Sequence, residues 1–279
     1  MHTRIVRHGD ADSFLRRASS WLLQTEAENN LVLGIAQRAH AHPELYVATV
    51  EQDGAVVGCA LRTPPRKLLL TRMPPSAVDA LAFDVAACFD DLPAVHGPPV
   101  AAREFARHWC DRHGCTAHEA MEQRVYALRQ VRDPERLPPG ELRFAEAQDV
   151  GLITSWVACF AMEARVEMPA TRDQIAEHIA AGQMALWWDE HPRTLAAYAG
   201  RSPHGVRIGP VYTPPEWRGR GYAGACVAAL SRRALEEGAD FCCLYTDLAN
   251  PTSNALYERL GYSPVCDAVD IDFVAVRPD

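Results

Sequence analysis

The sequence predicts an α/β protein built from two copies of one plan. Its 279 residues are enough for two domains of ordinary size, and 48% of them are apolar, which supports well-developed cores. Short apolar runs alternate with segments of helical periodicity along the chain. Residues 133–140 contain three prolines and a glycine and are typical of a linker, so we expect domains at 1–132 and 141–279.

The first half begins with an expected strand at 3–7 and a helix that Asp10 caps. The apolar segments 46–50 and 56–61 flank Asp53-Gly54, a dipeptide typical of a tight hairpin turn. The other elements expected in this half are a helix at 31–41, a strand at 67–71, a helix that follows Pro74-Pro75, a strand at 92–95, a helix at 101–112 and a strand at 123–131.

The second half restarts the pattern after the linker. Asp149 is placed to cap one helix, while Thr171 and Gln174 have the spacing of a capping box for the next, which Gly182 ends. The strands expected around these helices lie at 141–146, 184–188, 195–199 and 268–276, and the second and third of them flank a polar hairpin turn.

Three pairs of segments occur in the same order in the two halves. Residues 3–7 match 142–146, Pro74-Pro75 matches Pro214-Pro215, and 111–115 matches 258–262. Because three matches in one order are hard to obtain by chance, the sequence indicates that one domain was duplicated.

The segment 218–223, Arg-Gly-Arg-Gly-Tyr-Ala, joins an apolar strand that starts at Val206 to a helix rich in small residues. Glycines at such a junction let the backbone approach a ligand closely. The first N–H groups of a helix have no acceptor within it and lie at the positive end of its dipole, which suits a phosphate. Arg218 and Arg220 add charges that can pair with phosphate oxygens.

Two nucleotide-binding patterns can be compared with this turn. Gly219 and Gly221 fit the start of a dinucleotide-binding pattern, which would require Asp240 to lie near a ribose. The Walker pattern is excluded because no Gly-Lys-Ser/Thr follows the turn.

A second motif follows the short apolar strand 241–246. Asn250 suits an N-cap, Pro251 suits the first position of a helix, and Gly261 suits its end. Asn254 and Tyr257 are three residues apart and therefore share one face of that helix. An amide and a phenol that face one way, next to a phosphate turn, indicate a site.

These two motifs resemble the signatures of the GNAT superfamily of N-acetyltransferases. The family's Gln/Arg-x-x-Gly-x-Gly/Ala pattern is filled by Arg218, Gly221 and Ala223. Its later pattern, an Asn-rich turn followed by Leu-Tyr-x-x-x-Gly-Phe/Tyr, is filled by Asn254, Leu256, Tyr257, Gly261 and Tyr262. The close match runs from Arg218 to Tyr262, and the order of elements extends the resemblance over most of the second half.

The resemblance implies two tandem GNAT-like domains, each a mixed, mostly antiparallel sheet flanked by helices. It also implies acetyl-CoA as the cosubstrate, with no metal. The diphosphate would rest on the turn, and the pantetheine arm would lie along 209–213, where Pro210 interrupts the strand ladder. The cofactor contacts that it implies are Val211, Tyr212, Thr213, Arg218, Gly219, Arg220, Gly221, Tyr222, Ala223, Asn250, Asn254 and Tyr257.

Acetyl transfer needs a general acid for the leaving thiolate and a base for the attacking amine. Tyr257 is expected to be the acid, because an ordinary phenol pKa of about 10 is close to that of a thiol. Glu163 is the first candidate for the base, with Glu216, Asp247 and a chain of waters as alternatives. The expected function is N-acetylation of a primary amine by direct attack. The alternatives are a non-catalytic acyl-CoA sensing module and a transferase of another acyl group.

The first half is expected to have kept the fold and lost the cofactor site. The repeat aligns Val78, Leu81 and Phe83 with Arg218, Gly221 and Ala223, and it aligns Arg107 and Cys110 with Asn254 and Tyr257. Bulky side chains would then stand where the phosphate turn needs small ones. We expect this half to pack on the second and to wall part of the acceptor pocket, with a purely stabilising role as the alternative.

Composition excludes several other functions. A formal charge of −8 disfavours a broad nucleic-acid surface, and the N-terminal residues lack the apolar core of a signal peptide. Nine cysteines without a Cys-x-x-Cys pair indicate reduced thiols in the cytoplasm, and no apolar run is long enough to span a membrane. We expect a monomer or homodimer. The group His108, Cys110, His113, Cys115 and His118 is expected to belong to a metal-free helix and its end.

Overall fold

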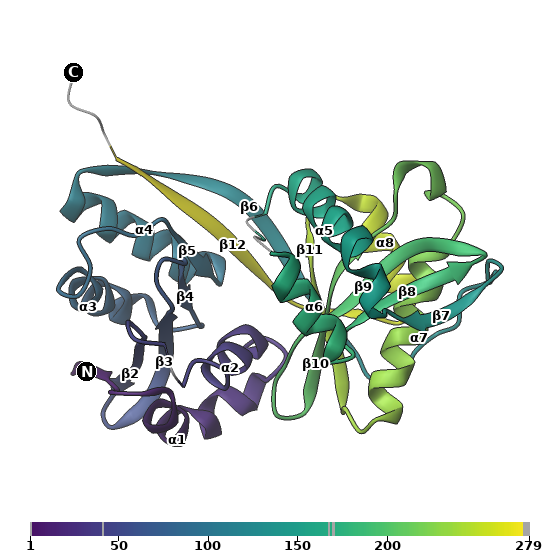
Figure 1. Ribbon diagram of the computed structural model, residues 1–279. Helices are drawn as coiled ribbons and strands as arrows, with labels where there is room; N and C mark the ends of the chain where they lie inside the picture. The colour runs from purple at the N-terminus through teal and green to yellow at the C-terminus, as the bar shows by residue number, and fades with distance from the viewer. Residues whose placement is uncertain (1, 41, 167, 169–170, 276–279) are drawn as a thin grey trace. The chain divides into compact units, whose positions relative to one another are not determined.

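The computed structural model describes residues 2–40, 42–166, 168 and 171–275 (Figure 1). Packing divides the chain into two compact units. The first unit contains Met1–Val125, Thr246–Asn250 and Pro264–Asp279, and the second contains Tyr126–Tyr245 and Pro251–Ser263. The linker expected at 133–140 would separate the two copies of the sequence repeat, and this domain boundary stays a prediction.

The first half of the chain forms the helices and strands that its periodicity predicts. Their bounds are β1 (Thr3–Arg7), α1 (Ala11–Leu22), α2 (Asn30–Ala36), β2 (Tyr46–Gln52), β3 (Ala55–Arg62), β4 (Leu68–Leu70), α3 (Pro75–Ala86), β5 (Ala94–Gly97), α4 (Pro99–His113) and β6 (Cys115–Leu128). The helix expected at 31–41 is shorter, since it ends at Ala36, and Ala41 lies outside the described residues. The strand expected at 123–131 is longer and begins at Cys115.

The second half repeats this order of elements. Their bounds are β7 (Glu141–Phe144), α5 (Val150–Ala164), α6 (Arg172–Ala180), β8 (Met184–Asp189), β9 (His191–Arg201), β10 (Gly205–Tyr212), α7 (Tyr222–Glu236), β11 (Phe241–Asp247), α8 (Pro251–Arg259) and β12 (Ser263–Ala275). The capping box of Thr171 and Gln174 is present at the start of α6. The last strand is longer than expected at its start, and Val276 lies outside the described residues.

Each unit contains a mixed, mostly antiparallel sheet, as predicted. The strand order is β1-β2-β3-β4-β5-β12-β6 in the first unit and β6-β11-β10-β9-β8-β7 in the second. The parallel pairs are β4–β5 and β10–β11. The antiparallel pairs of known register are β1–β2, β2–β3, β3–β4, β5–β12, β7–β8, β8–β9 and β9–β10.

The final strand of the chain belongs to the first unit. Val269 of β12 pairs with Gly97 of β5, and Ile271 pairs with Val95. Conversely, strand β6, which ends the first half of the chain, lies next to β11 of the second half. The two halves have therefore exchanged their last strands.

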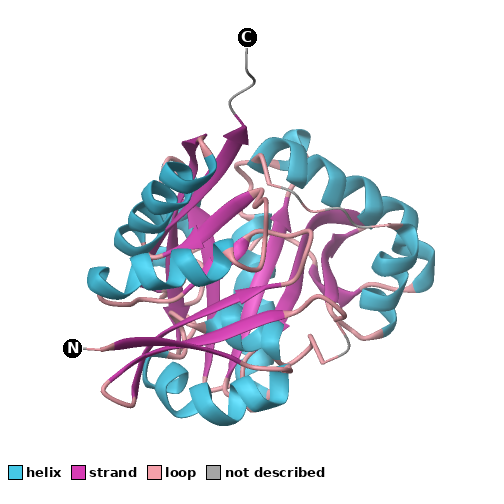
Figure 2. Cartoon of the chain, turned by 90° about the vertical axis from the view of Figure 1, so that its left-hand side faces the viewer, coloured by secondary structure: helices cyan, strands magenta, loops and turns pink. Residues whose placement is uncertain are grey.

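Helices cover both faces of the sheet in each unit, and Figure 2 shows them in cyan around the strands. In the first unit, Val47 of β2 packs with Phe14 of α1, while the next residue, Ala48, joins a core with Leu81 of α3 and Phe105 of α4. Successive strand side chains point to opposite faces, so this alternation places one core on each side of the sheet.

The second unit is layered in the same way. Leu186 of β8 contacts the cluster of Ile153 and Ile175 from α5 and α6, whereas Trp187 joins the cluster of α7 residues that includes Val227. The face with α7 and α8 is the one that bears the turn and helix motifs identified in the sequence. No helix within the described ranges is long and apolar enough to cross a bilayer.

Asp149 does not cap α5 with its side chain, contrary to the expectation from sequence. Its carboxylate accepts hydrogen bonds from the Glu146 N–H, at 2.8 Å, and from Arg143 Nη2, at 2.9 Å. These two donors, which replace the N–H groups of α5, both precede Asp149 in the chain. They can reach its carboxylate because residues 147–149 form a short 3₁₀ turn ahead of α5. Asp149 therefore joins β7 to the start of the helix.

Replacing Asp149 by Ala is expected to lower the free energy of unfolding by about 2–3 kcal/mol. The change removes a buried acceptor and leaves the half-buried Arg143 guanidinium without this partner. Urea unfolding followed by circular dichroism measures the loss. Asp173→Ala, in the exposed first turn of α6, is the matched control and should change stability by less than about 0.5 kcal/mol. Equal losses in the two variants would contradict the role of Asp149.

Candidate functional site

The sheet of the second unit opens where β10 leaves β11. The parallel ladder joins Gly205–Arg207 to Phe241–Cys243, and its register ends there, although β10 continues to Tyr212 beside β9. The ladder with β9 is itself irregular on both sides of Ile208, close to the cis peptide bond before Pro210. As a result, the part of β10 that contains Val211 has no ladder partner on the β11 side among the described residues.

The turn between β10 and α7 requires both of its glycines. Gly219 has φ +75° and Gly221 has φ +87°, in the left-handed region where residues with a Cβ are strained. Gly221 is the N-cap of α7, and its carbonyl accepts from the Ala225 N–H at 3.0 Å. The three N–H groups before Ala225 are therefore those of the first turn, which have no acceptor within the helix.

Arg218 and Glu163 lie together at this turn. Nη2 of Arg218 contacts both carboxylate oxygens of Glu163, at 2.9 and 2.7 Å, and its Nε donates to the Thr213 carbonyl at 2.8 Å. The two side chains are 46% and 42% exposed, so water screens the pair and its contribution to stability is at most about 1 kcal/mol. Arg218 is thus held against the end of α5 by a weak contact.

Trp217 fixes the other side of the turn. The guanidinium carbons of Arg193 and Arg220 lie 3.7 and 4.8 Å from the centre of its ring. The Tyr222 hydroxyl donates to Asp189 Oδ2 at 2.8 Å, and burial, followed by this hydrogen bond, raises the pKa of Tyr222. The side chain of Tyr222 is occupied in this contact, so its backbone N–H is the group that it can offer to a ligand.

Tyr257 lies on α8, next to the first turn of α7. A Cβ placed on Gly224 would be 3.1 Å from Leu256 Cδ1, which shows how closely the two helices approach. The Tyr257 ring is buried and meets the Tyr262 ring edge-on at 5.9 Å between centroids. Burial raises the pKa of Tyr257 to about 12. Its hydroxyl has no hydrogen-bond partner within the described part of the chain, whereas that of Tyr262 is 2.8 Å from Ser231 Oγ.

The remaining candidate residues belong to three different segments. Asn250 and Asp247 belong to the segment 246–250 that packs with the first unit, where the Asn250 N–H donates to the Asp247 carbonyl at 3.0 Å. Glu216 is exposed in the 3₁₀ turn 215–217, and Asn254 is half-buried on α8. The roles of these residues stay predictions.

Two neighbours of Glu163 were not identified as site residues from the sequence. Trp156 and Cys159 share one face of α5 with Glu163, and the Trp156 ring lies 6.1 Å from that of Tyr212. Burial raises the pKa of Tyr212, and a hydrogen bond with Cys159 raises it further. The helical spacing of these three residues was a usable signal, because side chains three and seven positions apart face the same way.

The first half lacks the phosphate turn itself. Residues 71–74 join β4 to α3, whereas the longer segment 213–221 joins β10 to α7. The sequence alignment placed Val78, Leu81 and Phe83 in the position of the turn, but all three lie inside α3. That alignment was wrong because it kept Pro74-Pro75 in register with Pro214-Pro215, ahead of a segment that only the second half contains.

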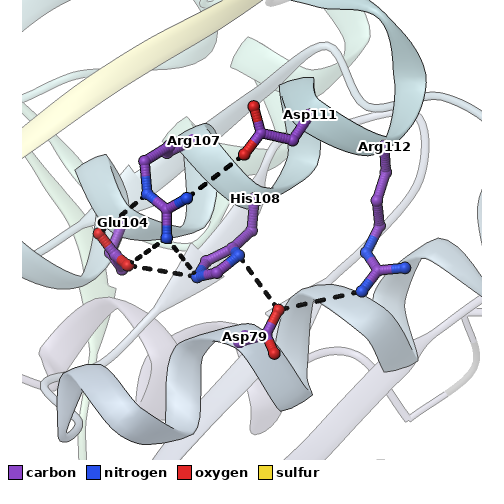
Figure 3. Close-up of polar contacts among 6 residues, drawn as sticks. All are labelled: Asp79, Glu104, Arg107, His108, Asp111 and Arg112. Atoms are coloured by element: carbon purple, nitrogen blue, oxygen red, sulfur yellow. Dashed lines mark hydrogen bonds and ion pairs between the residues drawn. The ribbon is translucent and has the colours of Figure 1, made fainter.

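Residues on α4 that align with Asn254 and Tyr257 serve other contacts. Arg107 Nη2 binds Glu104 Oε1 at 2.6 Å, and His108 Nδ1 lies 3.1 Å from Asp79 Oδ1 of α3 (Figure 3). Cys110 lies 3.0 Å from Cys115 between sulfur atoms. The charged face of α4 thus joins α3 to α4 through ion pairs at the position where the second half has its amide and phenol.

Comparisons with known proteins agree with this fold. A family model described as FR47-like protein matches residues 188–268. A GNAT-family acetyltransferase from Colwellia psychrerythraea is 11% identical over 97% of this chain and 98% of that chain, with a TM-score of 0.57. A GCN5-related N-acetyltransferase from Sphaerobacter thermophilus is 17% identical over 98% and 96%, with a TM-score of 0.60.

A third solved structure has the same two-domain plan. It is a tandem GNAT protein from the clavulanic acid biosynthesis pathway, 14% identical over 100% of both chains, with a TM-score of 0.54. No curated protein matches the sequence significantly. At these identities the likeness concerns the fold, and the chain has the fold of the GNAT superfamily, arranged as two tandem domains.

Proposed function

We propose that the second unit is an acyltransferase that moves an acetyl group from acetyl-CoA to a primary amine by direct attack. One observation carries the proposal: β10 separates from β11 after Arg207, just before the glycine turn that presents the first N–H groups of α7. An opened strand edge suits an extended amide-containing arm, and the helix start suits a diphosphate. The two features follow one another along the chain in the order that coenzyme A would require.

The residues at the turn fit a coenzyme A diphosphate. A Cβ placed on Gly219 would meet no atom within 4 Å, so the backbone there is open to a ligand. The N–H groups of residues 219–223 and the guanidinium of Arg220 would hold phosphate oxygens, with Arg218 available once it leaves Glu163. Tyr212 at the end of β10 and Thr213 just after it would border the arm, and Asn254 would bind it from α8.

Bound acetyl-CoA would supply an activated thioester carbon for attack by the amine. On the protein side, the Val211 N–H lies on the strand edge without a ladder partner towards β11 and is the candidate donor to the developing oxyanion. The face of α5 with Trp156 and Cys159 would border the acceptor. A net charge of −8 favours a cationic acceptor.

Tyr257 would hold the proton that the leaving thiolate takes. A pKa of about 12 keeps its hydroxyl protonated at neutral pH, although a phenol this weak is a poor donor to an ordinary thiolate. Burial in the same core raises the pKa of the Cys242 thiol to about 12, which supports the proposal that the pKa of a coenzyme A thiol would rise there as well. A sulfur buried beside Tyr257 would be shifted in the same direction, which keeps proton transfer close to balanced.

Glu163 would act both as the base for the amine and as the counter-ion of Arg218. In Glu163→Gln the base is lost, so kcat should fall by about 100-fold or more. The same change frees Arg218 for phosphate, so the KM for acetyl-CoA should fall about threefold, as expected for an exposed ion pair. Steady-state kinetics measure both constants.

Glu237→Gln is the matched control, because Glu237 forms a similar exposed pair with Arg233 at the far end of α7. It should leave both constants unchanged. An unchanged kcat in Glu163→Gln would reject the role as base, and an unchanged KM would reject the role as counter-ion.

The proposed function is tested by an acceptor screen. Acetyl-CoA is offered with a panel of primary amines, and thiol release is measured with wild-type protein. Release that depends on one or more amines supports the proposal. Tight binding of acetyl-CoA without turnover on any amine would favour an acyl-CoA binding module. Mass spectrometry of the copurified cofactor would show whether a longer acyl group is carried.

A further inference from the structure

A cavity of about 1070 Å³ lies in the first unit. Its wall comes from the start of β2, the end of β3, the connection 88–93 that follows α3, the last turn of α4 and the end of β12. It is therefore at the end of the sheet where α3 and α4 finish. The phosphate turn of the second unit lies where a helix begins, so the cavity is not the remnant of a cofactor site.

Arg62, the last residue of β3, is a buried cation in this wall. The residue is only 5% exposed. Its Nε donates to the Arg66 carbonyl at 3.0 Å, and its guanidinium carbon lies 4.2 Å from the centre of the Phe89 ring. Among the described residues no carboxylate lies within ion-pair distance of it. A buried charge without a counter-ion is costly, so an external partner is the simplest explanation of its position.

The other basic side chains of the wall have partners within the protein. Arg7 Nε lies 3.5 Å from Asp84 Oδ1, and its Nη1 donates to Cys88 Sγ at 3.0 Å. The His113 ring stacks on Trp109 at 3.8 Å. Arg62 is thus the group in this wall whose charge is left to be neutralised, within the described residues.

Acidic residues stand at the rim of the cavity rather than in it. Glu44, Asp90 and Asp91 are all exposed. The charges of Asp91 and Glu44 raise the pKa of Arg62. Burial has the larger effect and lowers the pKa of Arg62 below its ordinary value. Their negative field would oppose a multiply charged anion such as phosphate more than a single carboxylate.

Aromatic rings form much of the remaining wall. Tyr46 and Phe89 meet edge-on at 5.7 Å between centroids, and Trp109 lies 6.0 Å from Phe273. Flat apolar groups pack well against such rings. The volume is slightly above the range of about 300–1,000 Å³ that is usual for small-molecule sites.

We propose that this cavity binds an organic monocarboxylate with a flat, apolar body, the carboxylate on the guanidinium of Arg62 and the body against the rings of Phe89 and Trp109. A planar guanidinium can donate two parallel hydrogen bonds to a carboxylate, which gives direction as well as affinity. The proposal does not depend on the acyltransferase function of the second unit.

Matched ligand pairs test the proposal on the full chain. Indole-3-acetate and phenylacetate are compared with indole-3-acetamide, phenylacetamide and hexanoate by isothermal titration calorimetry. Both aromatic carboxylates should bind at least tenfold more tightly than their amides, and indole-3-acetate more tightly than hexanoate. Inorganic phosphate at millimolar concentration should not compete. Binding of neither aromatic carboxylate to the wild-type protein would overturn the proposal without any variant.

Two variants locate the site. Arg62→Gln should weaken binding of indole-3-acetate at least tenfold. Arg66→Gln removes the same charge from an exposed position four residues away, keeps the carbonyl that Arg62 uses, and should leave binding unchanged. Because Arg62→Gln alters a buried side chain, its fold is checked by circular dichroism, and quenching of tryptophan fluorescence in the wild-type protein, where Trp109 lines the cavity, gives a second measurement. Equal affinity in the two variants, or no quenching by a carboxylate that binds, would overturn the proposal.

Discussion

Replacing Tyr257 by Phe is expected to lower the kcat of acetyl transfer by about 10²- to 10⁴-fold, the range found for loss of a general acid. The KM for acetyl-CoA should change by less than about twofold, because the ring remains in the same core and only the proton donor is removed. Burial raises the pKa of the hydroxyl to about 12, so the group stays protonated below that pH. The wild-type kcat should therefore show no decline from Tyr257 between pH 7 and 10.

Tyr262→Phe is the matched control for this experiment. The two rings are in contact, but the Tyr262 hydroxyl is already bonded to Ser231. Its removal should lower the free energy of unfolding by about 1 kcal/mol and leave kcat within about twofold. If Tyr257→Phe retained full kcat, or if both variants lost it equally, Tyr257 would not be the proton donor.

Replacing Gly221 by Val is expected to weaken acetyl-CoA binding by about 10- to 100-fold and to lower the free energy of unfolding by about 1–3 kcal/mol. The stability loss arises because φ +87° is unfavourable for any side chain and most of all for a branched one. The binding loss arises because relaxation of that strain would turn the first N–H groups of α7 away from the diphosphate. Calorimetric titration with acetyl-CoA and urea unfolding measure the two effects.

Gly238→Val separates strain from binding. Gly238 has φ +101° just beyond the other end of the same helix, and a Cβ there would meet no atom within 4 Å. It should lose a similar amount of stability and keep wild-type affinity for acetyl-CoA. Equal affinity for acetyl-CoA in the two variants would show that the turn at Gly221 does not hold the cofactor.

Local structure was largely predictable because local chemistry determines it. Asp53-Gly54 fixed the hairpin of β2 and β3, and the Thr171 and Gln174 capping box fixed the start of α6. Asp149 was assigned to the wrong partner because two kinds of donor compete for its carboxylate, the N–H groups of the helix and the guanidinium of Arg143. Only the folded strand β7 brings Arg143 near. Side-chain competition of this kind is a tertiary property.

Strand partners were not predictable for a related reason. β6 ends in the apolar run Val125–Leu128, and β12 alternates apolar and acidic residues from Val269 to Phe273, but neither pattern specifies which strand lies beside it. At the candidate site, the glycines and Tyr257 were found because each needs a particular residue type. The contact of Arg218 with Glu163 depends on where α5 ends in space, and the Trp156 and Cys159 face depends on what α5 packs against.

The exchange of final strands has a consequence for biosynthesis. The second unit has all of its residues once Ser263 has left the ribosome, whereas the first must wait for the remainder of β12. Until then the nascent β5 presents an open edge that any other extended segment could occupy. The unit that is translated first is therefore completed last. Its correct folding depends on synthesis of the whole chain rather than on how early the unit begins to fold.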